Sequence, residues 1–117
     1  MPQGSRAERV GEEFREVLAE EIQKLKDPRV GFVTVTGVRV SPDLHHAWVY
    51  FTAYGEEKER AGTRAALRSA TKHLRHELGR QVRLKVTPEI EFVEDDTVER
   101  GERIDRIIEQ LHHEERP

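Results

Sequence analysis

Residues 33–51 read Val-Thr-Val-Thr-Gly-Val-Arg-Val-Ser-Pro-Asp-Leu-His-His-Ala-Trp-Val-Tyr-Phe, and the rest of the chain can be arranged around them. The β-branched and aromatic side chains predict two strands, the first over 30–40, and Ser-Pro-Asp at 41–43 predicts a turn. Because this turn is short, the strands should form an antiparallel hairpin. Val33 and Val35 share one face, whereas Val38 and Val40 have the opposite parity, so we predict a β-bulge at Gly37.

Amphipathic helices are predicted on both sides of the hairpin. Apolar residues at i, i+4, i+7 and i+8 predict a helix from about Arg6 to Leu25, which must end before Pro28. A second helix is predicted to end near Gly79. Its apolar positions are Ala66, Leu67, Ala70, Leu74 and Leu78.

A third strand is predicted over 82–92, where apolar and charged residues alternate, with Pro88 implying an edge position or a kink. Apolar spacing from Val98 to Leu111 predicts a C-terminal helix. The fold class is therefore α+β, with the helices covering one face of the sheet. We expect a flexible N-terminus at 1–5, one domain at 6–96, a helix at 97–111 and a flexible tail at 112–117.

Composition limits the kind of protein. The chain has 117 residues, enough for one domain, and 37% of them are charged. It has no cysteine, which excludes disulfides and thiolate metal sites and suits a reducing compartment. No apolar run approaches the roughly 20 residues of a membrane helix, and residues 1–9 lack a signal-peptide core. We expect a cytoplasmic monomer with no cofactor.

Positive charge is concentrated in residues 60–86. This stretch holds eight basic residues and one acid, Glu77, a net +7, whereas the remaining residues hold 12 basic and 22 acidic side chains, a net −10. Such a dipole is typical of a polyanion binder. The alternative is a solvated helix face with i,i+4 ion pairs, for which only Glu77 is a local partner. We therefore predict a nucleic-acid-binding surface that comprises Arg64, Arg68, Lys72, Arg75, His76, Arg80, Arg83 and Lys85.

Other candidate sites are weaker. The histidine pairs at 45–46 and 112–113 lack the spacing of a zinc site, and the acids at 94–96 are explained by a helix cap, so no metal site is predicted. No catalytic motif is present, and no catalytic residue is assigned. Trp48 and Tyr50 alternate with core residues, so they either stack on RNA bases or pack internally.

A set of short motifs occurs in order over roughly residues 6–111: Lys26-Asp27-Pro28-Arg29, the stretch from Val33 to Leu44, Ala47-Trp48-Val49-Tyr50, Leu74-Arg75, Leu78-Gly79, Val82-Arg83-Leu84-Lys85, Thr87-Pro88-Glu89-Ile90-Glu91-Phe92 and Asp95-Asp96. In these motifs the chain resembles the bacterial ribosome-binding factor A family.

The resemblance implies a type II KH-like domain, α-β-β-α-α-β, whose second helix is two helices that meet at a kink. The family carries Ala-x-Gly at that junction, which here is Ala70-Thr71-Lys72. Lysine at the glycine position implies either a gentler kink or right-handed helical geometry.

The implied function is non-catalytic binding to the small (30S) ribosomal subunit during late maturation of its 16S rRNA, with a link to cold adaptation. Two alternatives remain: a generic single-stranded RNA or DNA module, and a protein-interaction domain that uses the acidic first helix and tail. A small hydrolase is disfavoured because no nucleophile–base pair can be assembled.

Overall fold

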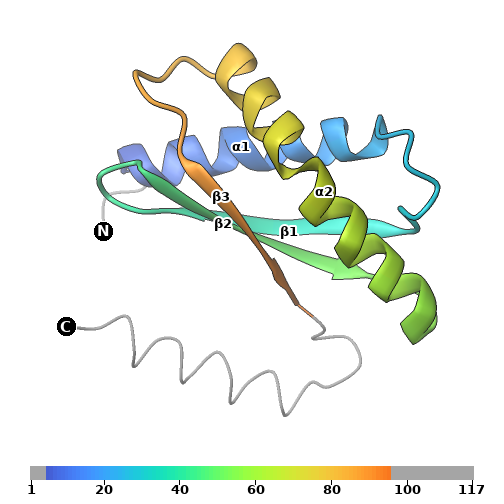
Figure 1. Ribbon diagram of the computed structural model, residues 1–117. Helices are drawn as coiled ribbons and strands as arrows, with labels where there is room; N and C mark the ends of the chain where they lie inside the picture. Colours follow the sequence, from blue (N-terminus) through green and yellow to red (C-terminus); the bar gives the residue numbers. More distant parts are fainter. Residues whose placement is uncertain (1–4, 96–117) are drawn as a thin grey trace, which may run out of the picture.

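The computed structural model describes residues 5–95 as two helices and a three-stranded sheet (Figure 1). The elements in chain order are α1 (Arg6–Gln23), β1 (Val33–Val40), β2 (His46–Ala53), α2 (Glu57–Gln81) and β3 (Glu89–Glu94). The sheet order is β1-β2-β3, with β2 antiparallel to β1 and parallel to β3. This arrangement confirms the predicted α+β fold and hairpin.

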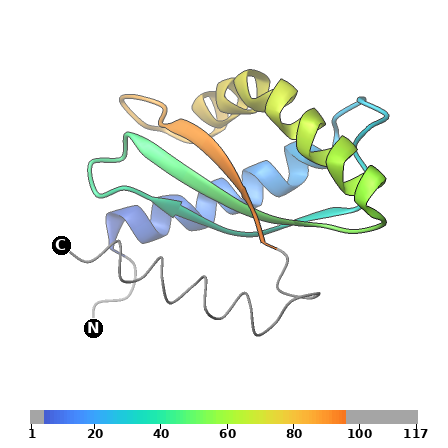
Figure 2. The same ribbon diagram turned by 60° about the horizontal axis from the view of Figure 1, so that its bottom comes forward.

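One hydrophobic core joins the helices to a single face of the sheet. Its members come from α1, the hairpin and α2, and the most deeply buried include Phe14, Leu18, Val49, Leu67, Leu74 and Leu78. Figure 1 shows the two helices crossing each other, and Figure 2 shows the same arrangement from a second direction. Because both helices bury their apolar stripes on this face, the polar face of α2 is left outside.

Helix α1 begins with a complete capping box. The Ser5 hydroxyl accepts a hydrogen bond from the Glu8 backbone N–H at 3.2 Å, and Glu8 Oε1 accepts from the Ser5 N–H at 3.0 Å. Two of the otherwise unsatisfied donors of the first turn are thereby paired. The helix ends at Gln23, before Pro28 as predicted. Ser5, which the sequence placed in the N-terminal lead, is therefore the N-cap.

The predicted β-bulge is present. Val35 pairs with Phe51 and Gly37 pairs with Tyr50, so β1 has one residue more than β2 between these two pairs. The extra residue restores the alignment of Val38 and Val40 with the core-facing Val49 and Ala47. The change of parity in the sequence therefore had the structural cause that we expected.

The hairpin turn places Leu44 in the left-handed region, with φ of 63°, while its side chain is buried. Leucine adopts this conformation at a cost of about 1–2 kcal/mol that glycine does not have. We therefore expect Leu44→Gly to be about 1 kcal/mol more stable than Leu44→Ala, although both lose the buried side chain. Urea unfolding of the two variants measures the difference, and a less stable glycine variant would contradict the strained turn.

The third strand is shorter than predicted. The sequence assigned residues 82–92 to it, but β3 begins at Glu89 and residues 83–88 form a loop. Pro88 has no N–H to donate, and the carbonyls of Thr87 and Pro88 accept hydrogen bonds from Arg75. The edge position of β3 is confirmed. Arg83 and Lys85, which were expected on the strand, therefore lie in the loop.

Helix α2 is one uninterrupted helix from Glu57 to Gln81, not two helices that meet at residues 70–72. Lys72 has a negative φ, since Leu44 is the only non-glycine residue among 5–95 with a positive value. The Thr71 hydroxyl donates to the Leu67 carbonyl at 2.9 Å, within the helix. Lysine favours the helical conformation far more than glycine does, which explains the continuity. Of the two expected accommodations of Lys72, the right-handed helical one is present.

The segment between α1 and β1 carries the Asp-Pro-Arg motif in a closed arrangement. Asp27 accepts hydrogen bonds from the Arg29 backbone N–H at 2.9 Å and from its guanidinium at 2.6 Å. The side-chain hydrogen bond from Arg29 is the main cause that lowers the pKa of Asp27 to about 2. The motif is therefore a local clamp on the backbone at 27–29.

Asp27→Asn should reduce the pH dependence of the stability of the fold, because it removes the carboxylate of this clamp. The folded-state pKa of about 2 lies below the ordinary 3.8, so the Asp27 carboxylate stabilises the fold above about pH 4, and the contribution is lost as the pH falls toward 2. Unfolding of both proteins between about pH 6 and pH 2 tests this. The difference in the free energy of unfolding between wild type and Asp27→Asn should become smaller only as the pH falls toward 2. A difference that stays constant with pH would contradict the charge pairing.

The predicted C-terminal helix at 97–111 and the tail at 112–117 lie outside the described residues. Among residues 5–95, no helix has the length and apolar character to cross a membrane. The same residues contain no group of three or more histidine, aspartate or glutamate side chains placed to hold a metal ion.

Candidate nucleic-acid interface

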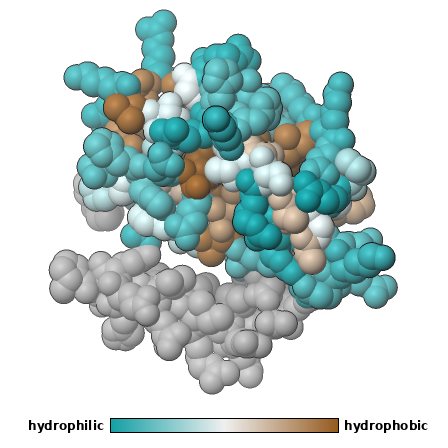
Figure 3. All heavy atoms as spheres, viewed as in Figure 1, coloured by the Kyte–Doolittle hydropathy of each residue, from teal (hydrophilic) through white to brown (hydrophobic). Residues whose placement is uncertain are grey.

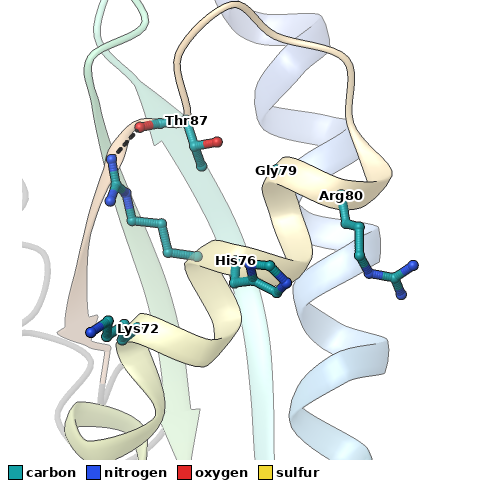
Figure 4. A pocket seen from close by; sticks show the side chains of 6 residues that line it. Lys72, His76, Gly79, Arg80 and Thr87 are labelled. Atoms are coloured by element: carbon teal, nitrogen blue, oxygen red, sulfur yellow. Dashed lines mark hydrogen bonds between the residues drawn. The ribbon is translucent and has the colours of Figure 1, made fainter.

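A hollow of about 530 Å³ lies between the C-terminal half of α2 and the loop that precedes β3. Figure 4 shows Lys72, His76 and Arg80 along the helix and Thr87 on the neighbouring loop, with the Arg80 side chain directed away from that loop. Arg75 and Gly79 complete the lining. Four of the residues predicted to bind RNA, spaced along one helix, thus meet at one depression.

Arg75 builds the wall of this hollow. Its guanidinium donates to the Thr87 carbonyl at 2.7 Å and to the Pro88 carbonyl at 2.9 Å, and it lies 3.5 Å from the Glu89 carboxylate. These contacts connect α2 to the start of β3, which explains where the loop ends and the strand begins. Arg75 therefore holds the hollow open and contributes its charge from a fixed position.

Four of the predicted cations are exposed and make no ion pair within residues 5–95: Arg68, Lys72, Arg83 and Lys85. His76 is exposed as well, and its ring lines the hollow. Arg80 pairs with Glu77 at 2.9 Å, yet 64% of its side chain stays exposed. The hydrogen bond to Glu77 raises the pKa of Arg80, which stays charged. Solvated cations of this kind can neutralise phosphates without breaking the fold.

Arg64 is used inside the fold instead. It donates to the Glu94 carboxylate at 2.8 Å and also pairs with Glu57, so it connects α2 to β3. Its hydrogen bonds to Glu94 and Glu57 raise the pKa of Arg64. The sequence missed these partners because they lie outside residues 60–86, 7 and 30 positions away.

Charge is unevenly distributed along α2 and the loop that follows it. Residues 68–85 hold six basic side chains and one acid, a net +5 with histidines neutral, whereas residues 56–59 hold three acids and one lysine, a net −2. Figure 3 shows hydrophilic side chains over most of the face visible in that view. The positive field is therefore concentrated at the C-terminal end of α2 and in the loop after it.

Trp48 and Tyr50 lie on the sheet face opposite the helices and are half-buried. The Trp48 ring is flanked by the Arg39 guanidinium at 5.0 Å and the His46 ring at 4.4 Å. His46 Nε2 in turn lies 3.2 Å from the Glu91 carboxylate. Trp48 thus has neighbours on its own sheet, and neither aromatic lines the hollow.

Thr87 is a lining residue that the sequence did not single out. The available signal is the Thr-Pro sequence that begins two residues after the basic Lys85, but the alternation of this stretch predicts a continuous strand. A proline in an apparent strand is found at the start of a strand as well as in an edge strand. If Pro88 is taken to precede the strand, Thr87 belongs to the loop beside α2.

The comparisons agree on one family. The family model described as ribosome-binding factor A matches residues 6–108. The ribosome-binding factor A of Thioalkalivibrio sulfidiphilus is 49% identical over 113 residues, covering 96% of this chain and 88% of the relative. That of Geobacter sulfurreducens is 42% identical over 111 residues, 94% of each chain.

Solved structures show the same relationship. The crystal structure of ribosome-binding factor A from Thermus thermophilus has a TM-score of 0.67 and 38% identity, covering 75% of this chain and 94% of that one. A homology model of the Thermus thermophilus factor, fitted into a cryo-EM map of its complex with the 30S subunit, has a TM-score of 0.65 and 36% identity, covering 78% of this chain and 96% of that one. With a family model that spans most of its length and relatives above 40% identity, this chain belongs to the ribosome-binding factor A family.

Proposed function

We propose that this protein is a non-catalytic assembly factor that binds the small ribosomal subunit through its 16S rRNA and assists late maturation of that RNA. The observation that carries the proposal is the cationic hollow, which Lys72, His76 and Arg80 line beside the loop that bears Arg83 and Lys85. The Thermus thermophilus relative fitted into a 30S complex supports the choice of partner. We further propose a cytoplasmic monomer that supports growth in the cold.

The hollow fits a phosphate backbone better than a base. Its lining is mainly cationic, with one hydroxyl on Thr87, and the His76 imidazole is the one aromatic ring among its six residues. Lysine and arginine that contact phosphates release counterions, so binding is strong at low salt and largely independent of sequence. Shape then has to supply selectivity, and a rigid helix facing a loop held by Arg75 presents the charges in a fixed arrangement.

Sedimentation of cell extract tests the proposed function. The protein should migrate with free small subunits and be absent from translating ribosomes. A uniform distribution through the soluble fractions would contradict it. A generic RNA-binding module predicts instead that arbitrary oligonucleotides compete with small subunits at equal affinity, with a log–log salt slope of about −0.7 per phosphate.

A further inference from the structure

Helices α1 and α2 both pack on one face of the sheet, which leaves the other face, the open face, without a helix among residues 5–95. The residues of β2 that alternate with its core residues point to the open face: His46, Trp48, Tyr50 and Thr52. Val93 of β3 joins them, because it pairs with Tyr50 and follows Phe92, which packs against the core. The middle of the open face is therefore an apolar centre of three half-buried residues, Trp48, Tyr50 and Val93.

The described chain ends at this open face. The Asp95 N–H donates to the Phe51 carbonyl at 2.6 Å, which continues the pairing of β3 with β2 by one residue. The Asp95 carbonyl accepts a hydrogen bond at 2.8 Å from the hydroxyl of Thr52, whose side chain lies on the open face. The backbone therefore leaves β3 with its last described carbonyl held at the open face, two residues along β2 from Tyr50.

The sequence that follows carries an apolar stripe that needs a partner. Four residues at i, i+3, i+4 and i+7 form this stripe: Ile104, Ile107, Ile108 and Leu111. The stripe belongs to the helix predicted over 97–111, which lies outside the described residues. A helix of about 15 residues is marginal in water unless its apolar face is buried. The apolar stripe therefore calls for an apolar surface within reach of Asp95.

The dimensions of this predicted helix and of the open face agree. A helix over 97–111 would be about 22 Å long and about 10 Å wide. The open face extends about 20 Å from His46 to Thr52, and three strands about 4.8 Å apart make it about 10 Å across. Only residue 96 separates Asp95 from the predicted helix, so the helix would start beside Thr52. One helix laid back along β2 from there covers the apolar centre.

We propose that residues 97–111 form a helix that packs on the open face, with its apolar stripe against the apolar centre. The sheet then lies between helices on both faces. Trp48 and Tyr50 pack internally, which is one of the two roles that the sequence left open for them, and they are not a stacking platform for RNA bases. This packing occurs within one chain, so it does not depend on binding to the ribosomal subunit.

Photocrosslinking within the full-length protein tests this packing. Tyr50→benzoylphenylalanine should react with residues 97–111 of the same chain and give a product of monomer mass, which peptide mapping locates. Lys58→benzoylphenylalanine is the control, because Lys58 is exposed in the first turn of α2, and it should give no adduct with 97–111. An adduct at position 50 with a second copy of the chain, an adduct only within residues 5–95, or no adduct would overturn the proposal.

The fluorescence of the unlabelled protein supplies a second measurement, because Trp48 is the only tryptophan of the chain. Ile104→Ala/Ile108→Ala should increase the quenching of Trp48 by acrylamide and lower Tm by about 5–10 °C, since two buried side chains are truncated. Alanine favours the helical conformation more than isoleucine does, so weaker helix formation would not explain the loss.

The matched control is Arg106→Ala/Gln110→Ala, which truncates two side chains on the opposite face of the same predicted helix. It should leave both the quenching of Trp48 and the Tm as in wild type. Unchanged quenching and Tm in Ile104→Ala/Ile108→Ala, or equal changes in the two variants, would overturn the packing of the stripe on the open face.

Discussion

Reversal of charge at Lys72 and Arg83 should lower the affinity for small ribosomal subunits about 100-fold, because two phosphate contacts become repulsions. Both side chains are exposed, so the substitutions should not disturb the core. The slope of log affinity against log salt should also become shallower, by about 0.7–0.9 for each lost phosphate contact. Titration of Lys72→Glu/Arg83→Glu with purified subunits at several salt concentrations measures both effects.

The matched control is Lys26→Glu/Lys58→Glu, which changes the net charge by the same amount. Lys26 and Lys58 are also exposed, but they lie in the segment after α1 and at the acidic end of α2. We expect this variant to bind within about threefold of wild type, because screened distant charges contribute little. Equal losses in the two variants would mean that only overall charge matters, and the hollow would then not be the RNA contact.

Gly11→Val should destabilise the fold by about 3 kcal/mol, because α1 and β1 touch at this point. A Cβ built on Gly11 would lie 2.7 Å from the Val38 carbonyl oxygen and 3.8 Å from Val40 Cγ2. The obstacle at 2.7 Å is backbone in the middle of a strand, so it cannot rotate away as a side chain would. Thermal unfolding should show a fall in Tm of more than about 10 °C.

Gly37 offers the control for this contact. A Cβ at Gly37 would meet nothing within 4 Å, although Gly37 lies at the bulge of β1, the strand that Gly11 approaches. Gly37→Ala should therefore stay within about 0.5 kcal/mol of wild type, whereas Gly11→Ala should lose about 1–3 kcal/mol. Indistinguishable melting of Gly11→Val and wild type would show that α1 does not approach β1 this closely.

Local pattern was sufficient for most of the fold. Helical apolar spacing in α1 and α2, and alternation in the hairpin, follow from which face of each element is buried, so the sequence records them directly. The bulge at Gly37 could be predicted for the same reason, because a change of parity needs one extra residue. The start of β3 could not, since alternation continues through residues 83–87 whether or not they pair.

The difference at β3 is physical. Arg75 donates hydrogen bonds to the carbonyls of Thr87 and Pro88, which lie 12 and 13 positions away in the chain. A local sequence pattern does not predict a contact of this kind. The same holds for Arg64, whose partner Glu94 is 30 positions away, and for the Gly31 N–H, which donates to the Thr63 hydroxyl 32 positions away.

The positive charge of residues 60–86 is a property of composition, and it was evident before any fold was known. Its division into cations that hold the fold and cations that face solvent is a property of tertiary structure. Side-chain charge is written in the sequence, but whether a charge is paired depends on groups that only folding brings within hydrogen-bonding distance. Arg64 and Arg75 hold elements together for that reason, and Lys72 and Arg83 remain available to a partner.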